Sequence, residues 1–225
     1  MTNNHLLLYR LAELMLEHEQ HILPVDLLFD DVQIGDFVKS IQIDSPYQQM
    51  LLEGILTESV REEKLFVSFT VEGYFHLVLG NVVFSHSKEK EHTYLIELLH
   101  SNQLNGVKEG VEQCLIYEVN QGKLERLVSL IDAGGVAEQI ARLPLAHAFM
   151  KNRVEDVFNL LMENPSIHDW NVIKHVRAIL SNNQKQQVVD ELDGIIKESE
   201  QLVQTINELL TRNNEIEFKF VKINK

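Results

Sequence analysis

Hydrophobic residues in the first 55 positions recur at helical spacing, in short segments separated by turn residues. Residues 4–19 carry four apolar side chains on one predicted helical face, Leu7, Leu11, Leu14 and Met15. A short helix is expected over Val25 to Asp30. Another follows Gly35 and Asp36, with apolar positions at Phe37, Val38 and Ile41.

A helix start signal occurs at Ser45, Pro46 and Gln48. Ser45 is the expected N-cap, Pro46 fits the first helical position, and Gln48 completes a capping box. This helix predicts a buried stripe formed by Met50, Leu51, Ile55 and Leu56.

Two β-rich runs then flank a charged tetrapeptide. Residues 56–60 and 65–69 lie on either side of residues 61–64, which predicts a β-hairpin with a solvated tip. The pattern then changes abruptly to helical spacing over Tyr74 to Val83, with Thr70 as the expected N-cap. Three or four helices and a hairpin within residues 1–85 indicate a winged-helix-like unit.

From Thr93 onward the pattern is helical almost to the end of the chain. Short breaks at Asn, Gly or Pro separate the apolar stripes, so successive helices are expected to pack as antiparallel hairpins. Residues 122–134 align with residues 152–164 at a period of 30, which favours a solenoid-like repeat. The expected stripes are 94–99, 107–119, 124–131, 136–150, 154–161 and 167–180.

The C-terminal part reads as a long helix over residues 184–212. Its apolar seam has coiled-coil spacing, which fits either a helix that caps the last repeat or a self-association segment. Residues 216–220 alternate like a strand and would need the N-terminal hairpin, a partner chain or further sequence to pair with. The seam comprises Val188, Leu192, Ile195, Ser199, Leu202, Ile206 and Leu209.

These patterns together predict a mainly α chain in four parts. They are a winged-helix-like domain at 1–85, an α-helical repeat domain at 86–183, a long coiled-coil-like helix at 184–213, and a strand or tail at 214–225.

Charge makes nucleic acid a disfavoured partner. The chain has 34 acidic and 20 basic residues, and its net charge of −14 opposes the phosphate backbone. The N-terminus lacks the basic start of a signal peptide, and no apolar run reaches the length of about 18 residues that a membrane span needs. We therefore expect a cytoplasmic protein without membrane contact.

Candidate chemistry is sparse, and we assign no catalytic, cofactor-binding or metal-binding residue. Cys114 lies in an apolar helical pattern, which favours a buried apolar role over a reactive thiol. His18 and His21, beside Glu17, have the nearest metal-like spacing, but no third ligand is recognisable, so exposed polar residues are the simpler interpretation. Partly buried structural roles are expected for His76, His147 and His175, and a core-anchoring role for Trp170.

Three N-terminal motifs resemble the winged-helix part of STAND or NACHT-type signalling NTPases. They are Leu8-Tyr-Arg-Leu-Ala-Glu-Leu-Met15, Leu51-Leu-Glu-Gly-Ile-Leu56 and the strand-to-helix junction from Leu65 to Phe75. The resemblance covers about residues 6–84 and is followed by repeats, as in that family.

The chain differs from the family in two respects, at the strand-to-helix junction and in the part of the family's proteins that it covers. Val71 stands where the family's nucleotide-contacting histidine is expected, and the NTPase core is absent. The resemblance therefore implies the regulatory and sensor end of such a protein, excised from it or encoded separately. A second resemblance, to an ankyrin unit at 143–164, depends on Leu143-Pro-Leu-Ala-His-Ala148.

The expected function is a non-enzymatic protein–protein interaction or regulatory module, within a signalling NTPase assembly if the resemblance holds. No cofactor is expected. One alternative is a nucleic-acid-binding winged helix, although the candidate recognition helix from Pro46 to Leu56 contains Glu53 and no Lys or Arg. The other is an unrecognised metal-dependent enzyme that uses His18 and His21.

The coiled-coil spacing of the tail predicts self-association of the full chain through this helix. Light scattering should then give a molar mass above that of one chain, increasing with protein concentration. A monomer at the highest accessible concentration would contradict this prediction.

Overall fold

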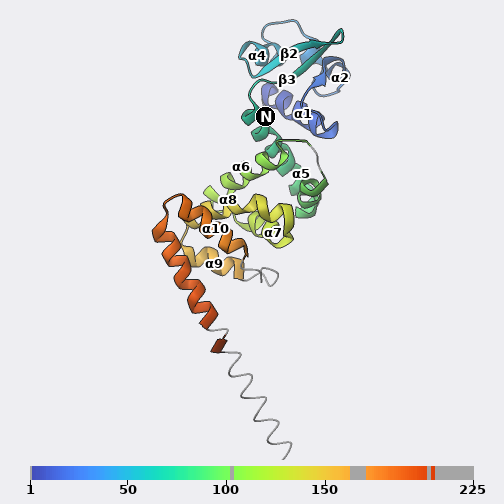
Figure 1. Cartoon of the computed structure of the whole chain (residues 1–225). Coiled ribbons are helices and arrows are strands. Elements are labelled where there is room, and N and C mark those ends of the chain that lie inside the picture. Colours follow the sequence, from blue (N-terminus) through green and yellow to red (C-terminus); the bar gives the residue numbers. More distant parts are fainter. Residues whose placement is uncertain (1, 102–103, 163–170, 202–203, 206–225) are drawn as a thin grey trace, which may run out of the picture. The chain divides into compact units, whose positions relative to one another are not determined.

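The computed structural model describes residues 2–101, 104–162, 171–201 and 204–205, which are mainly helical with a small antiparallel sheet near the N-terminus (Figure 1). The predicted mainly α fold is therefore confirmed. Internal contacts divide the chain after Ala148 into two units, residues 1–148 and 149–225.

The first unit begins with short helices around a three-stranded sheet of order β1-β3-β2. Helix α1 buries all four of the side chains predicted for its apolar face. The strands are antiparallel, and β1 contributes only two residues, paired with Val67 and Phe66 of β3. The elements are α1 (Asn3–Glu17), β1 (Leu23–Pro24), α2 (Val25–Phe29), α3 (Gly35–Lys39), α4 (Pro46–Leu52), β2 (Leu56–Arg61) and β3 (Lys64–Phe69).

The predicted hairpin is confirmed, with a tighter tip than the charged tetrapeptide suggested. Arg61 pairs with Lys64 in the ladder, so only Glu62 and Glu63 form the turn. Both have positive φ, 48° and 65°, as two-residue hairpin turns that match the twist of the strands require.

Helix α4 is capped at its start and packs against the sheet along one face. The Ser45 hydroxyl accepts a hydrogen bond from the Gln48 N–H at 3.3 Å, which confirms the predicted N-cap. Tyr47 and Met50 are buried, and the Tyr47 hydroxyl donates to Glu58 of β2 at 2.8 Å. These contacts fix the orientation of α4 and so determine which of its side chains are exposed to solvent.

The prediction for Ile41 is wrong. Helix α3 ends at Lys39, and Ser40 has an extended conformation, so Ile41 falls outside the helix and is 92% exposed. The Ser40 hydroxyl accepts the Gln42 N–H at 3.3 Å, which favours a turn over another helical turn.

Helix α5 (Glu72–Ser101) is one continuous helix of 30 residues that includes both stripes predicted separately at 74–83 and 94–99. The intervening sequence lacks Gly and Pro and includes the helix formers Lys and Glu, so nothing interrupts it. The predicted domain boundary between residues 85 and 86 falls inside this helix. Thr70 is not the N-cap: the helix begins two residues later, and the Thr70 N–H donates to the Ile55 carbonyl at 2.9 Å.

The remaining helices follow the predicted stripes closely. Pro144 lies inside α8, so the ankyrin-like motif lies within a helix and not before a helix pair. Arg177 of α10 forms a 2.6 Å ion pair with Asp193 of the following helical residues 186–201. The elements are α6 (Val107–Asn120), α7 (Glu125–Ala133), α8 (Gly135–Lys151), α9 (Val154–Met162) and α10 (Asn171–Asn182).

Helices α7 and α9, which contain the two copies of the predicted repeat, are alike in length and burial, and the solenoid-like repeat itself stays a prediction. Each has nine residues, and their first residues are 29 positions apart. Leu127 and Ile131 are buried in α7, and Val157 and Leu161 at the equivalent positions of α9. Trp170, the strand at 216–220 and the last positions of the predicted seam lie outside the described residues.

Helices α5 and α6 cross where two glycines meet. A Cβ on Gly80 would lie 2.3 Å from the Gly110 carbonyl oxygen, and a Cβ on Gly110 would lie 2.3 Å from the His76 carbonyl oxygen. Only residues without a side chain allow the two backbones to approach this closely. Within the described part of the chain, no helix has both the length and the apolarity for a membrane crossing.

The substitution Gly80→Ala should push α5 away from α6. Because overpacking of this kind strains the structure, the free energy of unfolding should fall by about 1–3 kcal/mol. Thermal denaturation followed by circular dichroism measures the loss, and hydrogen exchange in residues 76–86 locates it. Gly73→Ala is the matched control, because it lies in the same helix and its Cβ would meet nothing within 4 Å. Equal stability of the Gly80→Ala variant and the wild-type chain would contradict the close crossing.

Candidate interaction surfaces

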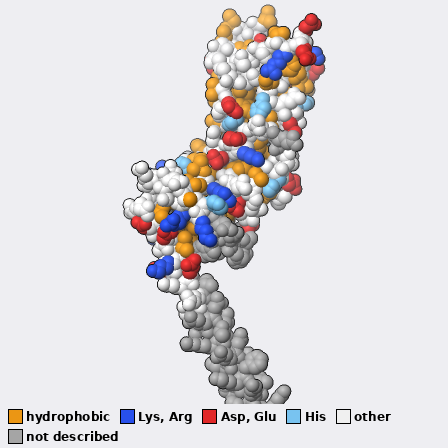
Figure 2. Space-filling view, in the orientation of Figure 1, with side chains coloured by type: hydrophobic (Ala, Val, Ile, Leu, Met, Phe, Trp, Pro, Cys, Tyr) orange, Lys and Arg blue, Asp and Glu red, His pale blue; other side chains and the backbone are white. Residues whose placement is uncertain are grey.

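Aliphatic side chains project into solvent from α4 and the loop before it. Ile43 is 76% exposed and Leu52 is 70% exposed. Both line a hollow of about 590 Å³, together with Gln42, Asp44, Gln49 and Glu53, and we call these six residues the α4 face. Figure 2 shows hydrophobic side chains at the surface of the part of the molecule that contains the sheet.

Hydrogen bonds hold the backbone of this face in place. The Ser45 N–H donates to the Gln42 carbonyl at 2.9 Å, and the Ser45 hydroxyl donates to the Ser40 carbonyl at 3.4 Å. On α4, the Gln49 side-chain oxygen accepts from Asn4 of α1 at 3.2 Å. The exposed Ile43 therefore projects from a closed, hydrogen-bonded loop.

The α4 face is acidic as well as apolar. Asp44 and Glu53 line the hollow, whereas α4 itself contains no Lys or Arg. Residues 1–85 contain 13 Asp and Glu residues against 4 Lys and Arg residues, so this part of the chain carries much of the net negative charge. Such a surface attracts cationic groups and repels phosphates.

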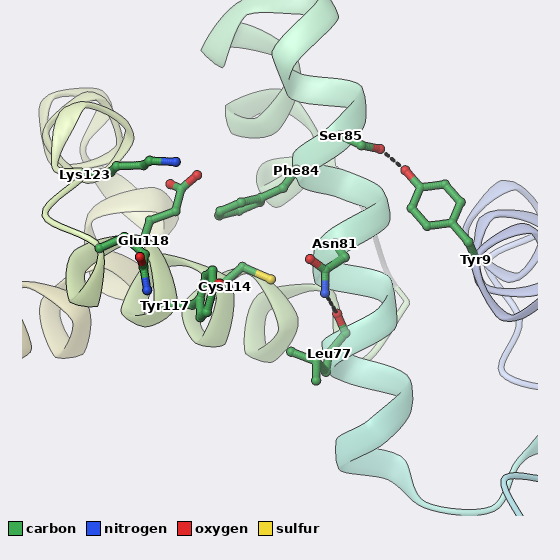
Figure 3. Close-up of a pocket in the computed structure, with 10 residues that line it drawn as sticks. Tyr9, Leu77, Asn81, Phe84, Ser85, Cys114, Tyr117, Glu118 and Lys123 are labelled. Atoms are coloured by element: carbon green, nitrogen blue, oxygen red, sulfur yellow. Dashed lines mark hydrogen bonds between the residues drawn. The ribbon is translucent and has the colours of Figure 1, made fainter. Parts of the chain in front are cut away.

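A second hollow lies between α5 and α6, beside the glycine crossing (Figure 3). It measures about 610 Å³. Phe84 points from α5 toward α6, and the Tyr9 hydroxyl of α1 hydrogen-bonds the Ser85 hydroxyl of α5. The lining residues are Tyr9, Leu77, Asn81, Phe84, Ser85, Cys114, Tyr117, Glu118, Gln121 and Lys123.

Glu118, which lines this second hollow, is paired with a buried arginine. The Glu118 carboxylate lies 3.2 Å from Nε of Arg126, a buried arginine whose guanidinium lies 4.2 Å from the centre of the Phe84 ring. Arg126 also contacts the Ser87 hydroxyl. Because Glu118 compensates a buried cation, its role here is structural.

Cys114 is buried, as the sequence predicted. Burial, with a smaller contribution from the nearby Glu118 carboxylate, raises the pKa of its thiol to about 11. At neutral pH the side chain is therefore a protonated thiol, which is a poor nucleophile.

The histidines singled out in the sequence are scattered. His18 and His21 are exposed at and beyond the end of α1, and the His21 ring lies edge-on to Phe75 at 5.4 Å. His76 and His147 are partly buried as predicted, whereas His175 is exposed, which corrects that prediction. In the ranges that the structure describes, no three His, Cys, Asp or Glu side chains gather as a metal site.

Sequence reasoning missed a charged network that joins α5 to α1. His86 Nε2 lies 2.7 Å from the Glu13 carboxylate, and Arg10 pairs with Glu13 and with Asp31 at 2.9 Å. His86 and Glu13 are 73 residues apart in the chain, so no local pattern could indicate their contact.

Compared with models of protein families, with curated proteins and with solved structures, the chain has no match. The resemblance to STAND or NACHT-type NTPases therefore stays a prediction that depends on the three N-terminal motifs.

Alkylation of the native chain by iodoacetamide at pH 8 should be roughly a hundredfold slower than in concentrated urea, where the thiol pKa is about 8.5. The native rate should rise as the pH approaches the thiol pKa of about 11. Because the unfolded thiol ionises first, the thiol's contribution to stability falls as the pH rises between these two pKa values. The matched Cys114→Ser variant should show neither labelling nor this dependence, and rapid native labelling at pH 8 would contradict the assignment.

Proposed function

We propose that this chain is a non-enzymatic protein-interaction module and that the α4 face binds its protein partner. The observation that carries the proposal is the exposure of Ile43 and Leu52 around one hollow on an ordered backbone. Apolar surface with a polar rim is typical of protein interaction sites.

Nucleic acid is a poorer fit to the same surface. In a winged helix, the helix before the hairpin is the element expected to enter the major groove, and here that helix is α4. Its surroundings present Asp44 and Glu53, and the hairpin tip presents Glu62 and Glu63. Phosphate binding depends on Lys and Arg, so these side chains favour a protein partner.

The order of elements supports the winged-helix-like interpretation. Helix α1, the short strand β1, helices α2 to α4 and the β2–β3 hairpin follow one another as in that class of unit. With the three N-terminal motifs, this order supports a role as a regulatory module of a STAND-like signalling assembly, with the NTPase core as a candidate partner.

The test uses the full chain to recover a partner, which is then purified and titrated by isothermal calorimetry. Leu52→Asp should raise the dissociation constant roughly 30-fold, because burial of one leucine contributes about 2 kcal/mol to the free energy of binding. Val60→Asp is the matched control, since Val60 is also exposed but lies on the hairpin.

Three results would contradict the proposal. They are the absence of any protein partner at micromolar concentrations, equal binding by the Leu52→Asp and wild-type chains, and tighter binding of a labelled DNA or RNA duplex than of any protein in fluorescence anisotropy.

A further inference from the structure

We infer that the partner of the α4 face presents two Lys or Arg side chains on either side of an aliphatic cluster, spaced about seven residues apart on a helix. This inference rests on the proposed function and adds the chemistry of the partner.

The first support is that the acidic side chains of the face lack internal counterions. Among the described residues, neither Asp44 nor Glu53 forms an ion pair. Some carboxylates elsewhere in this unit do have such partners, including Asp31 with Arg10 and Glu118 with Arg126. The charges at the α4 face thus remain available to a partner.

The second support is the position of Glu53. It is the C-cap residue of α4, where the final carbonyl groups of the helix already carry partial negative charge. A carboxylate at this end is unfavourable in the free chain, and a cation placed beside it interacts favourably with both the carboxylate and the helix end.

The spacing follows from the geometry of α4. Asp44 lies just before the helix and Glu53 just after it, with the aliphatic hollow between them. The seven residues of α4 rise about 10 Å and the two acidic residues flank that span, so Lys or Arg side chains seven residues apart on a partner helix, angled outward, can meet one carboxylate each. Aliphatic residues three and four positions after the first cation share its face of the partner helix and would enter the hollow.

The hydrogen-bonded backbone lowers the entropic cost of such binding. Ile43 is held outward by the bonds of Ser45 to Gln42 and Ser40, so little loop ordering is needed when a partner arrives.

The probe is a synthetic alanine-based helical peptide with two lysines seven residues apart and two leucines between them on the same face. A second peptide has glutamates in place of the lysines. Fluorescence anisotropy with the full chain at low salt should show roughly tenfold tighter binding of the lysine peptide. Added salt should reduce that preference.

Charge reversal locates the effect. The double variant Asp44→Lys/Glu53→Lys should lose the preference or invert it in favour of the glutamate peptide. Glu62→Lys/Glu63→Lys is the matched control: it makes the same change of charge at the hairpin tip and should keep the preference for the lysine peptide.

The inference is overturned if the lysine peptide does not bind, if both peptides bind equally, or if the two double variants behave alike. The natural partner distinguishes this failure from that of the proposed function. If Leu52→Asp abolishes binding of the partner but Asp44→Lys/Glu53→Lys does not change it, the proposed function stands and only the proposed chemistry of the partner is refuted. A partner unaffected by Leu52→Asp removes the proposed function itself.

Discussion

The backbone contact of α5 with α6 at Gly80 and Gly110 is the constraint on which the helical part of residues 1–148 depends. Its effect extends along α6, because the crossing buries Cys114 and positions Glu118 beside Arg126 of α7. Arg126 in turn lies over Phe84 of α5, which closes a triangle of contacts among the three helices. A larger side chain at either glycine would separate the first pair of helices and so disturb the third.

The same long helix also connects these helices to the sheet-bearing part of the chain. Near its start, Phe75 of α5 lies 5.2 Å from the Phe69 ring of β3, and further along His86 meets Glu13 of α1. The sequence predicted a domain boundary between residues 85 and 86, yet the structure places a continuous helix there. The N-terminal elements and α6 therefore pack against one helix and belong to one contact unit.

Local features of this fold could be predicted from the sequence, and features between distant residues could not. The Ser45 cap, the hairpin and the helical stripes depend on neighbours within a few positions, which periodicity and capping rules describe well. The glycine crossing, the contacts of Arg126 with Phe84 and Ser87, and the His86–Glu13 pair join residues 30 or more positions apart, so one sequence contains no signal for them. The α4 face was half predictable: the lack of Lys and Arg in α4 is a sequence fact, but the exposure of Ile43 and Leu52 depends on how α4 packs against the rest of the unit, which no local pattern specifies.

The negative charge of the α4 face also disfavours binding of a second copy of this chain. A second copy that docked symmetrically through this face would place Asp44 and Glu53 against a surface with the same negative charges. Such like-charge contacts are unfavourable at an interface, although the aliphatic hollow alone would favour pairing. Under the proposed function, the two carboxylates disfavour self-association of the chain through Ile43 and Leu52 and favour a partner of opposite charge.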